Sequence, residues 1–434
     1  MTHEYEGSQT TKKSPGTNTK QAVCNEPCCI INRAKMSGNK PANKKISSND
    51  ATPFNRKKPQ NETSNDGKTR NKKKINEQSN IKTKKKSARK NEMLGIEAVR
   101  DLVAGFKPGM IVECDILKFE VLNLLGSGAF GSVYCCCETN SRTEYAMKIE
   151  MIPGPSDNFL RCLPWEEEIL LRLQEFELSK RKNFASLIDR GTTGDNKFRI
   201  MVMSLLGKSL IDWKKASHLG NRFSGNTAWK IGYQTLQALE FFHQAGFVHR
   251  DLKPHNYSSG VKSSDELVYV FDFGLVRCYT GKVYKTAIPE GAGTLGTLKY
   301  MSLASHNSVV QYPKDDIECW LYTLMDLYDP ASLVWGNCTV QTDVGRAKEA
   351  LLSANLTKNI FTFLPNEYAY LIKKVGQMVL VEPVSKRPSE VKKIRYESFY
   401  MILDRICEKL GYSVNKPFDW NTPQFLKKMK KPKE

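Results

Sequence analysis

The sequence lacks an apolar run long enough to cross a bilayer, and its first residues lack the features of a secretory signal. The longest apolar runs, such as residues 200–206, are far shorter than the roughly 20 residues of a transmembrane helix. No succession of charged, apolar and small residues marks a signal peptide, and Thr2 stands where myristoylation requires glycine. We therefore expect a soluble protein without a membrane span, located in the cytoplasm, the nucleus or both.

Metal motifs are also missing, although the chain has 12 cysteines. Cys24, Cys28 and Cys29 lie close together, but no second cysteine cluster or nearby histidine completes a metal site. The consecutive cysteines at 135–137 must alternate between the two faces of an expected strand. We assign neither group to a metal, and without a secretory signal the cysteines indicate a reducing compartment.

Acidic residues are scarce in the first 90 residues, which carry most of the excess positive charge. This segment holds 22 Lys and Arg against 7 Asp and Glu, a balance of +15 within a formal net charge of +20. Its apolar residues are too scattered to offset the entropy of ordering, so we predict a disordered basic tail over residues 1–92. The densest run, residues 82–90, is a solvated charge run, a nuclear-import signal or a contact for acidic polymers. No aromatic residues interleave with its lysines, which argues against sequence-specific nucleic-acid binding.

Regular patterns begin near Met93 and change in character along the chain. Short apolar runs bounded by turn residues predict strands over residues 111–112, 119–125, 133–137, 145–151, 198–203 and 267–271. Apolar residues at helical spacing predict helices around residues 166–173 and 229–242, and the pattern beyond residue 315 is mainly helical. A strand-rich beginning followed by a helical remainder predicts an α+β fold with two lobes.

Three glycines between residues 125 and 133 form the pattern G-x-G-x-x-G-x-V. The pattern alone is a weak signal, because a flexible hairpin or a dinucleotide-binding turn has similar spacing. The residues after Gly131 continue as a strand rather than a helix, which favours a loop that folds over the phosphates of ATP. The nucleotide-contacting residues expected in this loop are Leu125, Gly126, Ser127, Gly128, Ala129, Phe130, Gly131 and Val133.

Lys148 is a single lysine on the next apolar strand. Burial of its ammonium group would be costly without an anion, so Lys148 is either a surface residue of an edge strand or a ligand of the α- and β-phosphates. In the second case a helix carboxylate should hold it in place. Glu166 is the best candidate because it shares the apolar face of its predicted helix, whereas Glu167 and Glu168 should point elsewhere.

Two further segments match patterns with a known chemical purpose. Residues 249–256 fill every position of H-R-D-L-x-x-x-N, and residues 272–274 read D-F-G directly after an apolar strand. Either segment alone could arise by chance. Their order after the glycine loop and Lys148 predicts an enzyme that transfers the γ-phosphoryl group of ATP.

This chemistry assigns a role to each charged residue of the two segments. Asp251 is expected to accept the proton of the substrate hydroxyl, and Lys253 to neutralise charge on the γ-phosphate. Asn256 and Asp272 are the expected ligands of Mg²⁺. Because catalysis here rests mainly on positioning and electrostatics, the presence of all four residues predicts activity.

With these motifs, residues 110–410 resemble the protein kinase superfamily, and in detail the casein kinase I group, especially its tau-tubulin kinase-like branch. The finer resemblance rests on residues 202–210, 296–302, 315–318, 364–368 and 417–420. The group also lacks the usual A-P-E motif, where this chain reads Ser-Leu-Ala at residues 302–304. The resemblance implies a non-specific serine/threonine protein kinase that uses ATP and Mg²⁺.

The resemblance also implies a domain organisation. We expect a bilobal protein kinase domain over residues 93–415, with a β-rich N-lobe over about 110–203 and a mainly helical C-lobe over about 207–415. The tail would precede this domain, and residues 416–434 would form a short basic C-terminal extension. A monomer is expected.

Further residues receive roles from the resemblance by position. Met203 corresponds to the gatekeeper, Leu205 and Leu206 to hinge residues that contact adenine, and Ala146 to a residue of the nucleotide site. Lys253 fits the serine/threonine pattern rather than the tyrosine pattern. Members of the group generally need no phosphorylation of the activation segment, which implies that the chain is active as made.

The chain departs from the pattern of the group at Ser204, Lys299, Ala304 and Leu321. The group usually has arginine in place of Lys299, and lysine keeps the charge but loses the planar, bidentate fork. Lys299 is therefore the candidate residue for recognising acidic or phosphate-primed protein substrates. The resemblance to the tau-tubulin kinase-like branch implies that cytoskeletal proteins are also among the substrates. None of the four positions carries the chemical step.

Two functions of different classes are open on these residues. The first is an active serine/threonine kinase. With either function, the basic tail could also dock the protein onto acidic polymers such as tubulin tails or nucleic acid. The second is a kinase-fold scaffold that binds partners through its lobes and tail without useful turnover, a function that the departures at Lys299, Ala304 and Leu321 would motivate.

Overall fold

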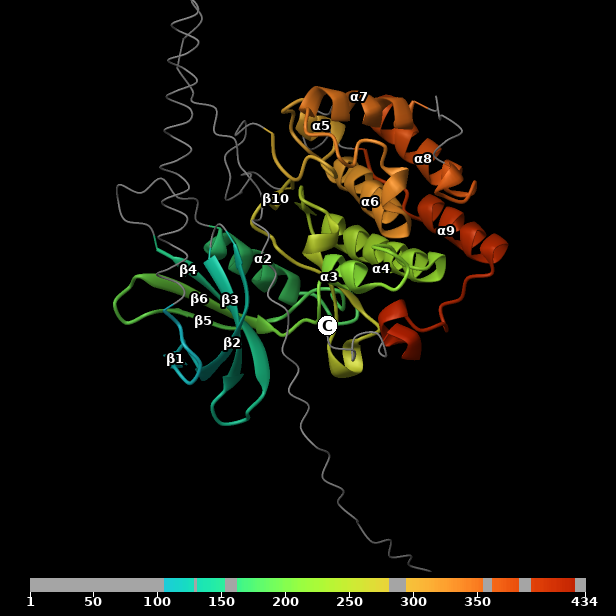
Figure 1. Cartoon of the computed structure of the whole chain (residues 1–434). Helices are drawn as coiled ribbons and strands as arrows, with labels where there is room; N and C mark the ends of the chain where they lie inside the picture. The colour runs from blue at the N-terminus through green and yellow to red at the C-terminus, as the bar shows by residue number, and fades with distance from the viewer. Residues whose placement is uncertain are drawn as a thin grey trace, which may run out of the picture.

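The computed structural model describes residues 105–128, 131–152, 162–280, 294–353, 361–381 and 392–425. Figure 1 shows two lobes, of which the first is mainly β-sheet and the second mainly helical. The predicted α+β, two-lobed fold is therefore confirmed. The predicted disordered tail lies outside the described residues, as do Ala129 and Phe130 of the glycine loop.

A six-stranded antiparallel sheet in the order β1-β2-β3-β4-β6-β5 forms the N-lobe. Its strands are β1 (Ile111–Glu113), β2 (Lys118–Gly128), β3 (Gly131–Glu138), β4 (Glu144–Met151), β5 (Leu187–Thr192) and β6 (Phe198–Ser204). The five strands predicted in this region are confirmed, and β5 is an additional edge strand. Apolar side chains such as Phe119, Met147 and Val202 are fully buried in the N-lobe core.

Helix α2 (Leu163–Gln174) packs against strands β5 and β6 of the N-lobe sheet and against the core of the C-lobe. Proline in its first turn suits a helix start, because the missing N–H would have no partner within the helix. Its buried residues Ile169, Leu170 and Leu173 belong to the core of the C-lobe. The indole N–H of Trp165 donates to the carbonyl of Val276 at 2.8 Å, which fixes α2 to the segment that follows the D-F-G motif.

The C-lobe is built around two long helices. Its helices are α3 (Leu210–Ala216), α4 (Gly225–Gln244), α5 (Leu303–His306), α6 (Pro313–Tyr328), α7 (Gln341–Leu352), α8 (Tyr368–Gly376) and α9 (Glu397–Leu410). Two short ladders join β7 (Phe247–Val248) to β10 (Arg277–Cys278) and β8 (Tyr257–Ser259) to β9 (Val268–Val270). Among the described helices, none combines the length and apolar character that a bilayer span requires.

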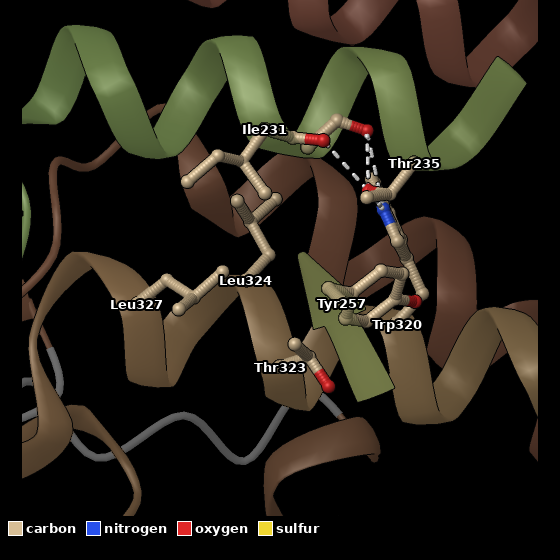
Figure 2. Close-up of a pocket in the computed structure, with 8 residues that line it drawn as sticks. Ile231, Thr235, Tyr257, Trp320, Thr323, Leu324 and Leu327 are labelled. Atoms are coloured by element: carbon tan, nitrogen blue, oxygen red, sulfur yellow. Dashed lines mark hydrogen bonds between the residues drawn. The ribbon is translucent and has the colours of Figure 1, made fainter. Parts of the chain in front are cut away.

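Helices α4 and α6 pack closely against each other in the middle of the C-lobe (Figure 2). The indole N–H of Trp320 on α6 donates to Thr235 Oγ1 on α4 at 3.0 Å. Gly232 lets Leu324 approach α4 closely, because a Cβ atom at Gly232 would lie only 2.9 Å from Leu324 Cδ1. The gap between these residues is too small to hold a water molecule. It is therefore a small packing gap of the core and not a ligand site.

The segment after α9 returns to the core of the C-lobe. Phe418, Trp420 and Phe425 are 0%, 2% and 0% exposed. Between them, Asp419 accepts hydrogen bonds from the Ser224 amide at 2.7 Å, the Ser224 hydroxyl at 2.6 Å and the Thr227 hydroxyl at 2.8 Å, at the start of α4. The C-lobe therefore extends to Phe425, beyond the boundary predicted at residue 415.

Candidate active site

Lys148 is paired with a helix carboxylate. It lies in the interior of the sheet, where β4 pairs with β3 on one side and β6 on the other, so it is not on an edge strand. Its Nζ lies 2.6 Å and 2.7 Å from the two carboxylate oxygens of Glu166 on α2. The neighbouring carboxylates point elsewhere, as predicted, because Glu167 binds Arg199 and Glu168 binds Arg172.

The electrostatic surroundings of Lys148 favour its charged form. Burial disfavours the ammonium group, but the negative charges of Glu166 and then Asp272 outweigh this effect and raise the pKa of Lys148. Glu166 is itself only 3% exposed, so the pair is shielded from solvent. Lys148 therefore keeps its positive charge beside Glu166 and Asp272, at the position where the sequence predicts phosphate binding.

The described parts of the glycine loop leave space for a ligand. Gly128 pairs with Gly131 at the end of the β2–β3 ladder, where a side chain at Gly131 would collide with the carbonyl oxygen of Ile149. A Cβ at Gly126 or Gly128, in contrast, would meet no atom within 4 Å. Ser127 and Ser132 hydroxyls lie 2.8 Å apart across the hairpin. The open space beside the first two glycines fits a loop that approaches phosphates.

The predicted catalytic residues converge on one buried carboxylate. Asp251 is 4% exposed, and its Oδ2 accepts hydrogen bonds from Lys253 Nζ at 2.7 Å and Asn256 Nδ2 at 3.2 Å. Its Oδ1 accepts from both the amide and the hydroxyl of Thr297 at 3.1 Å. Thr297 lies in the segment before α5 and orients the Asp251 carboxylate. The sequence motifs did not assign a role to Thr297.

The loop that carries Asp251 is fastened by a second buried carboxylate, Asp316 on α6. Its two oxygens accept the backbone amides of His249 at 2.6 Å and Arg250 at 2.9 Å. These bonds hold Arg250 at a φ of 71°, in the left-handed region that non-glycine residues seldom adopt. Asp316 was part of a resemblance motif, but no pattern in the sequence indicated this role.

Asp272 lies close to Glu166. A Cβ on Gly274 would be 3.4 Å from Glu166 Oε1 and 3.6 Å from Asp272 Oδ1, so both carboxylates flank the D-F-G glycine. Asp272 also has a left-handed φ of 67°. Phe273 is 3% exposed and stacks on Phe242 of α4 at 5.8 Å between ring centroids, which anchors the motif in the C-lobe core.

The predicted metal ligands carry suitable donor atoms. Asn256 Nδ2 donates to the Asp251 carbonyl at 2.8 Å, so the amide oxygen is the atom left for a metal. Asn256 and Asp272 thus offer an amide and a carboxylate oxygen, the donors that Mg²⁺ prefers beside phosphate oxygens. No cluster of three or more His, Cys, Asp or Glu side chains in the described ranges could hold a metal.

The predicted hinge residues follow the last strand of the N-lobe. Met203 on β6 pairs with Ala146 on β4, which brings the two predicted nucleotide-site residues side by side. Leu205 and Leu206 come next and are half-buried. The amide of Gly207 then donates to the Ser259 carbonyl at 2.8 Å, so the connection is anchored to the C-lobe at once.

Lys299 is engaged by a carboxylate of the C-lobe. Its Nζ lies 2.6 Å from Oδ1 of Asp326 on α6, and its side chain is 26% exposed. Asp326 also binds Lys214 on α3 and accepts a hydrogen bond from the Tyr300 hydroxyl at 3.0 Å. Two lysines thus share one buried carboxylate, and the role of Lys299 in substrate recognition stays a prediction.

Comparisons with known proteins agree with this geometry. Residues 119–312 match the protein kinase domain. The chain is 28% identical over 307 residues to the serine/threonine-protein kinase spe-6 of Caenorhabditis elegans, covering 70% of this chain and 75% of the relative. It is 29% identical over 307 residues to a protein of the same organism named "Putative casein kinase I", covering 70% of this chain and 83% of the relative. Together with the two-lobed fold and the arrangement around Lys148 and Asp251, these matches identify a protein kinase domain in this chain and support its place in the protein kinase superfamily.

Proposed function

We propose that this protein is an active serine/threonine kinase of the casein kinase I type that phosphorylates hydroxyl groups of other proteins. The observation that carries the proposal is the buried Asp251 carboxylate, which Lys253, Asn256 and Thr297 hold in one orientation. Such a fixed carboxylate suits the proton acceptor of a phosphoryl transfer. The relative named as a casein kinase I supports the finer assignment.

The residues at the site fit ATP and Mg²⁺. When bound, ATP supplies the γ-phosphoryl group, and Mg²⁺ offsets the charge on the phosphates. Lys148, fixed by Glu166, binds phosphate oxygens, while Asn256 and Asp272 provide oxygen atoms to the metal. The backbone around Gly126 and Gly128 has the open space that a phosphate contact needs.

The chemical step depends on the residues around Asp251. Its carboxylate would accept the proton of the substrate hydroxyl as the hydroxyl oxygen bonds to the γ-phosphorus, while the bond from this phosphorus to the β–γ bridging oxygen breaks and ADP leaves. Lys253 Nζ lies 2.7 Å from Asp251 Oδ2 and 3.1 Å from Thr297 Oγ1, so its positive charge is beside the reacting atoms and offsets the developing negative charge. The Thr297 amide and hydroxyl prevent the carboxylate from turning away.

We include acidic proteins among the proposed substrates. Lys214 and Lys299 together carry two positive charges against the single negative charge of Asp326. The partly exposed Lys299 therefore leaves a net positive charge next to the segment that contains Thr297. An acidic side chain of a substrate would be attracted to this surface.

The alternative function, a scaffold without turnover, has no specific support in the site. Leu321 is 0% exposed within the C-lobe core, and Lys299 is paired with Asp326. These departures therefore have roles in packing and pairing, and neither removes a residue that the chemistry requires.

The test is phosphate transfer from labelled ATP, with Mg²⁺, to casein and to acidic, neutral and phosphorylated peptides. Asp251→Asn should reduce turnover by about 10²–10⁴-fold, because the loss of a general base typically has this effect. Asp195→Asn, which changes an exposed loop carboxylate, is the matched control and should leave turnover unchanged. Wild-type protein that binds ATP but transfers no phosphate would instead support the scaffold.

A further inference from the structure

The hydrogen bonds that fasten the catalytic loop continue beyond Asp316 toward the helices that end the C-lobe. Asp316 Oδ2, which accepts the His249 amide, also lies 2.9 Å from Nε2 of His243 on α4. The other ring nitrogen, Nδ1, is hydrogen-bonded to the hydroxyl of Tyr396. Tyr396 directly precedes α9 and is 153 positions from His243, so this contact joins distant parts of the chain.

When the His243 ring is neutral, the chemistry of its two partners fixes the direction of both hydrogen bonds. An ionised carboxylate only accepts, so Nε2 of His243 carries a proton and donates it to Asp316. In the neutral ring, Nδ1 is then an acceptor, and the Tyr396 hydroxyl donates to it. The Tyr396 hydroxyl thus stabilises the one neutral tautomer of His243 that can bind Asp316.

Water cannot easily replace a lost member of this chain. His243 is 4% exposed, Asp316 0% and Tyr396 6%. A buried polar group that loses its partner is costly, so removal of one hydroxyl should disturb the groups that follow it. The last group in the series is the backbone of His249 and Arg250, directly before Asp251.

The backbone at this point is sensitive to the position of Asp316. Arg250 adopts a left-handed φ of 71°, and the hydrogen bond from its amide to Asp316 Oδ1 at 2.9 Å compensates this conformation. A shift of the Asp316 carboxylate would weaken this hydrogen bond and allow the backbone of Arg250 to leave the left-handed conformation. Asp251, as the next residue, would then change its orientation toward the substrate hydroxyl.

We propose that Tyr396 is a positioning residue for the catalytic loop. Its hydroxyl orients His243, His243 orients the carboxylate of Asp316, and Asp316 holds the two amides that precede Asp251. The effect on turnover rests on the proposed kinase function, whereas the effect on the loop backbone does not.

The kinetic test compares two variants that each remove a single buried hydroxyl. Tyr396→Phe should lower kcat by about 5- to 10-fold, as expected for the loss of one buried hydrogen bond, with KM for ATP and peptide changed less than about 2-fold. Tyr368→Phe is the matched control, because the Tyr368 hydroxyl on α8 is buried without a hydrogen-bond partner among the described residues. It should leave kcat unchanged. Equal kcat values for wild type and Tyr396→Phe would overturn the inference.

A double-mutant cycle tests whether Tyr396 acts through His243. In a His243→Asn background, Tyr396→Phe should have no further effect on kcat, because the ring that the hydroxyl orients is absent. Full additivity of the two substitutions would contradict the proposed path.

Hydrogen–deuterium exchange provides a readout that needs no activity. The peptide containing His249 and Arg250 should exchange faster in Tyr396→Phe than in the wild type or Tyr368→Phe, since its amides are held less firmly. Faster exchange in a protein that transfers no phosphate would uphold the inference and reject the proposed function. Active wild-type protein with unchanged exchange in Tyr396→Phe would reject the inference alone.

Discussion

At the scale of single residues, Lys148 keeps its charge although its side chain is only 18% exposed, because Glu166 lies beside it. Lys148→Met largely retains the length of the side chain and removes the charge that we propose binds the phosphates. We expect turnover to fall by about 10²-fold or more, with a small change in unfolding temperature because Glu166 can take up a proton. Kinetic assays and thermal unfolding check both outcomes.

The control for this prediction is Lys197→Met, which removes an exposed lysine paired with Asp195 at 3.0 Å. It should leave both quantities nearly unchanged. Comparable turnover in Lys148→Met and the wild type would show that Lys148 does not act on the phosphates.

Lys299 requires a different substitution. A glutamate at this position would face Asp326, and the repulsion would obscure any effect on substrates. We therefore predict that Lys299→Met raises KM for acidic peptides by about 3- to 10-fold, since it removes the attraction between opposite charges, and leaves neutral peptides unaffected. Lys299→Arg keeps the positive charge and should therefore leave KM for acidic peptides close to that of the wild type. A similar loss on acidic and neutral peptides would show that Lys299 acts through packing alone.

The roles of residues that belong to a short motif or a helical pattern could be predicted from the sequence. The roles of residues whose partners are distant in the sequence could not. Glu166 could be identified because its helix face is visible in the spacing of its neighbours. Thr297 and Asp251 are 46 positions apart, and Asp316 and His249 are 67 positions apart, so only the tertiary fold brings each pair together. Short motifs contain no information about such distances.

At the scale of elements, strand β5 shows why the sheet was predicted incompletely. Its residues, Leu187–Thr192, read L-I-D-R-G-T, and the charges and glycine conceal the apolar pattern of a strand. The strand lies at the edge of the sheet, where one face tolerates polar side chains. The interior strands contain a larger share of apolar residues than β5 and were therefore found.

The start of helix α4 depends on Asp419, which is 7% exposed and accepts three hydrogen bonds from Ser224 and Thr227. We predict that Asp419→Ala lowers the free energy of unfolding by about 2–4 kcal/mol, since hydrogen bonds to a charged group contribute more than neutral ones. Urea denaturation measures this change.

Asp343→Ala is the control, because Asp343 is a half-exposed residue in the first turn of α7 whose partner is Arg346. It should cost less than about 0.5 kcal/mol, as is usual for surface pairs. If both variants were equally stable, the segment around Asp419 would not contribute to the fold as described.

At the scale of the whole molecule, buried acids make stability depend on pH. Burial raises the pKa of Glu150 from 4.5 to about 7, although the amides of Cys162 and Leu163 donate to it. Between these two values the unfolded chain releases the proton while the folded protein keeps it, so rising pH favours unfolding. We predict that Glu150→Gln reduces the loss of stability between about pH 5 and pH 7.5 by on the order of 1–3 kcal/mol.

Thermal unfolding of wild type and Glu150→Gln across this range provides the measurement. The two curves of Tm against pH should lie close together near pH 5, where Glu150 is protonated in the folded protein, and diverge toward pH 7.5, where burial of the ionised carboxylate destabilises only the wild type. Parallel curves would mean that Glu150 is ionised in the folded protein. Asp315, whose pKa burial also raises to about 7, should produce the residual slope of the variant.

The hydrogen bonds between Ser224 and Asp419 also determine when the start of α4 can be completed during protein synthesis. The two residues are 195 positions apart, so α4 leaves the ribosome long before the residue that completes its first turn. At roughly 5–20 residues per second, the interval is about 10–40 s. During this time the aromatic surface that Phe418 and Trp420 later cover is exposed, so we expect chaperones to bind the nascent C-lobe until the last residues of its core have been synthesised.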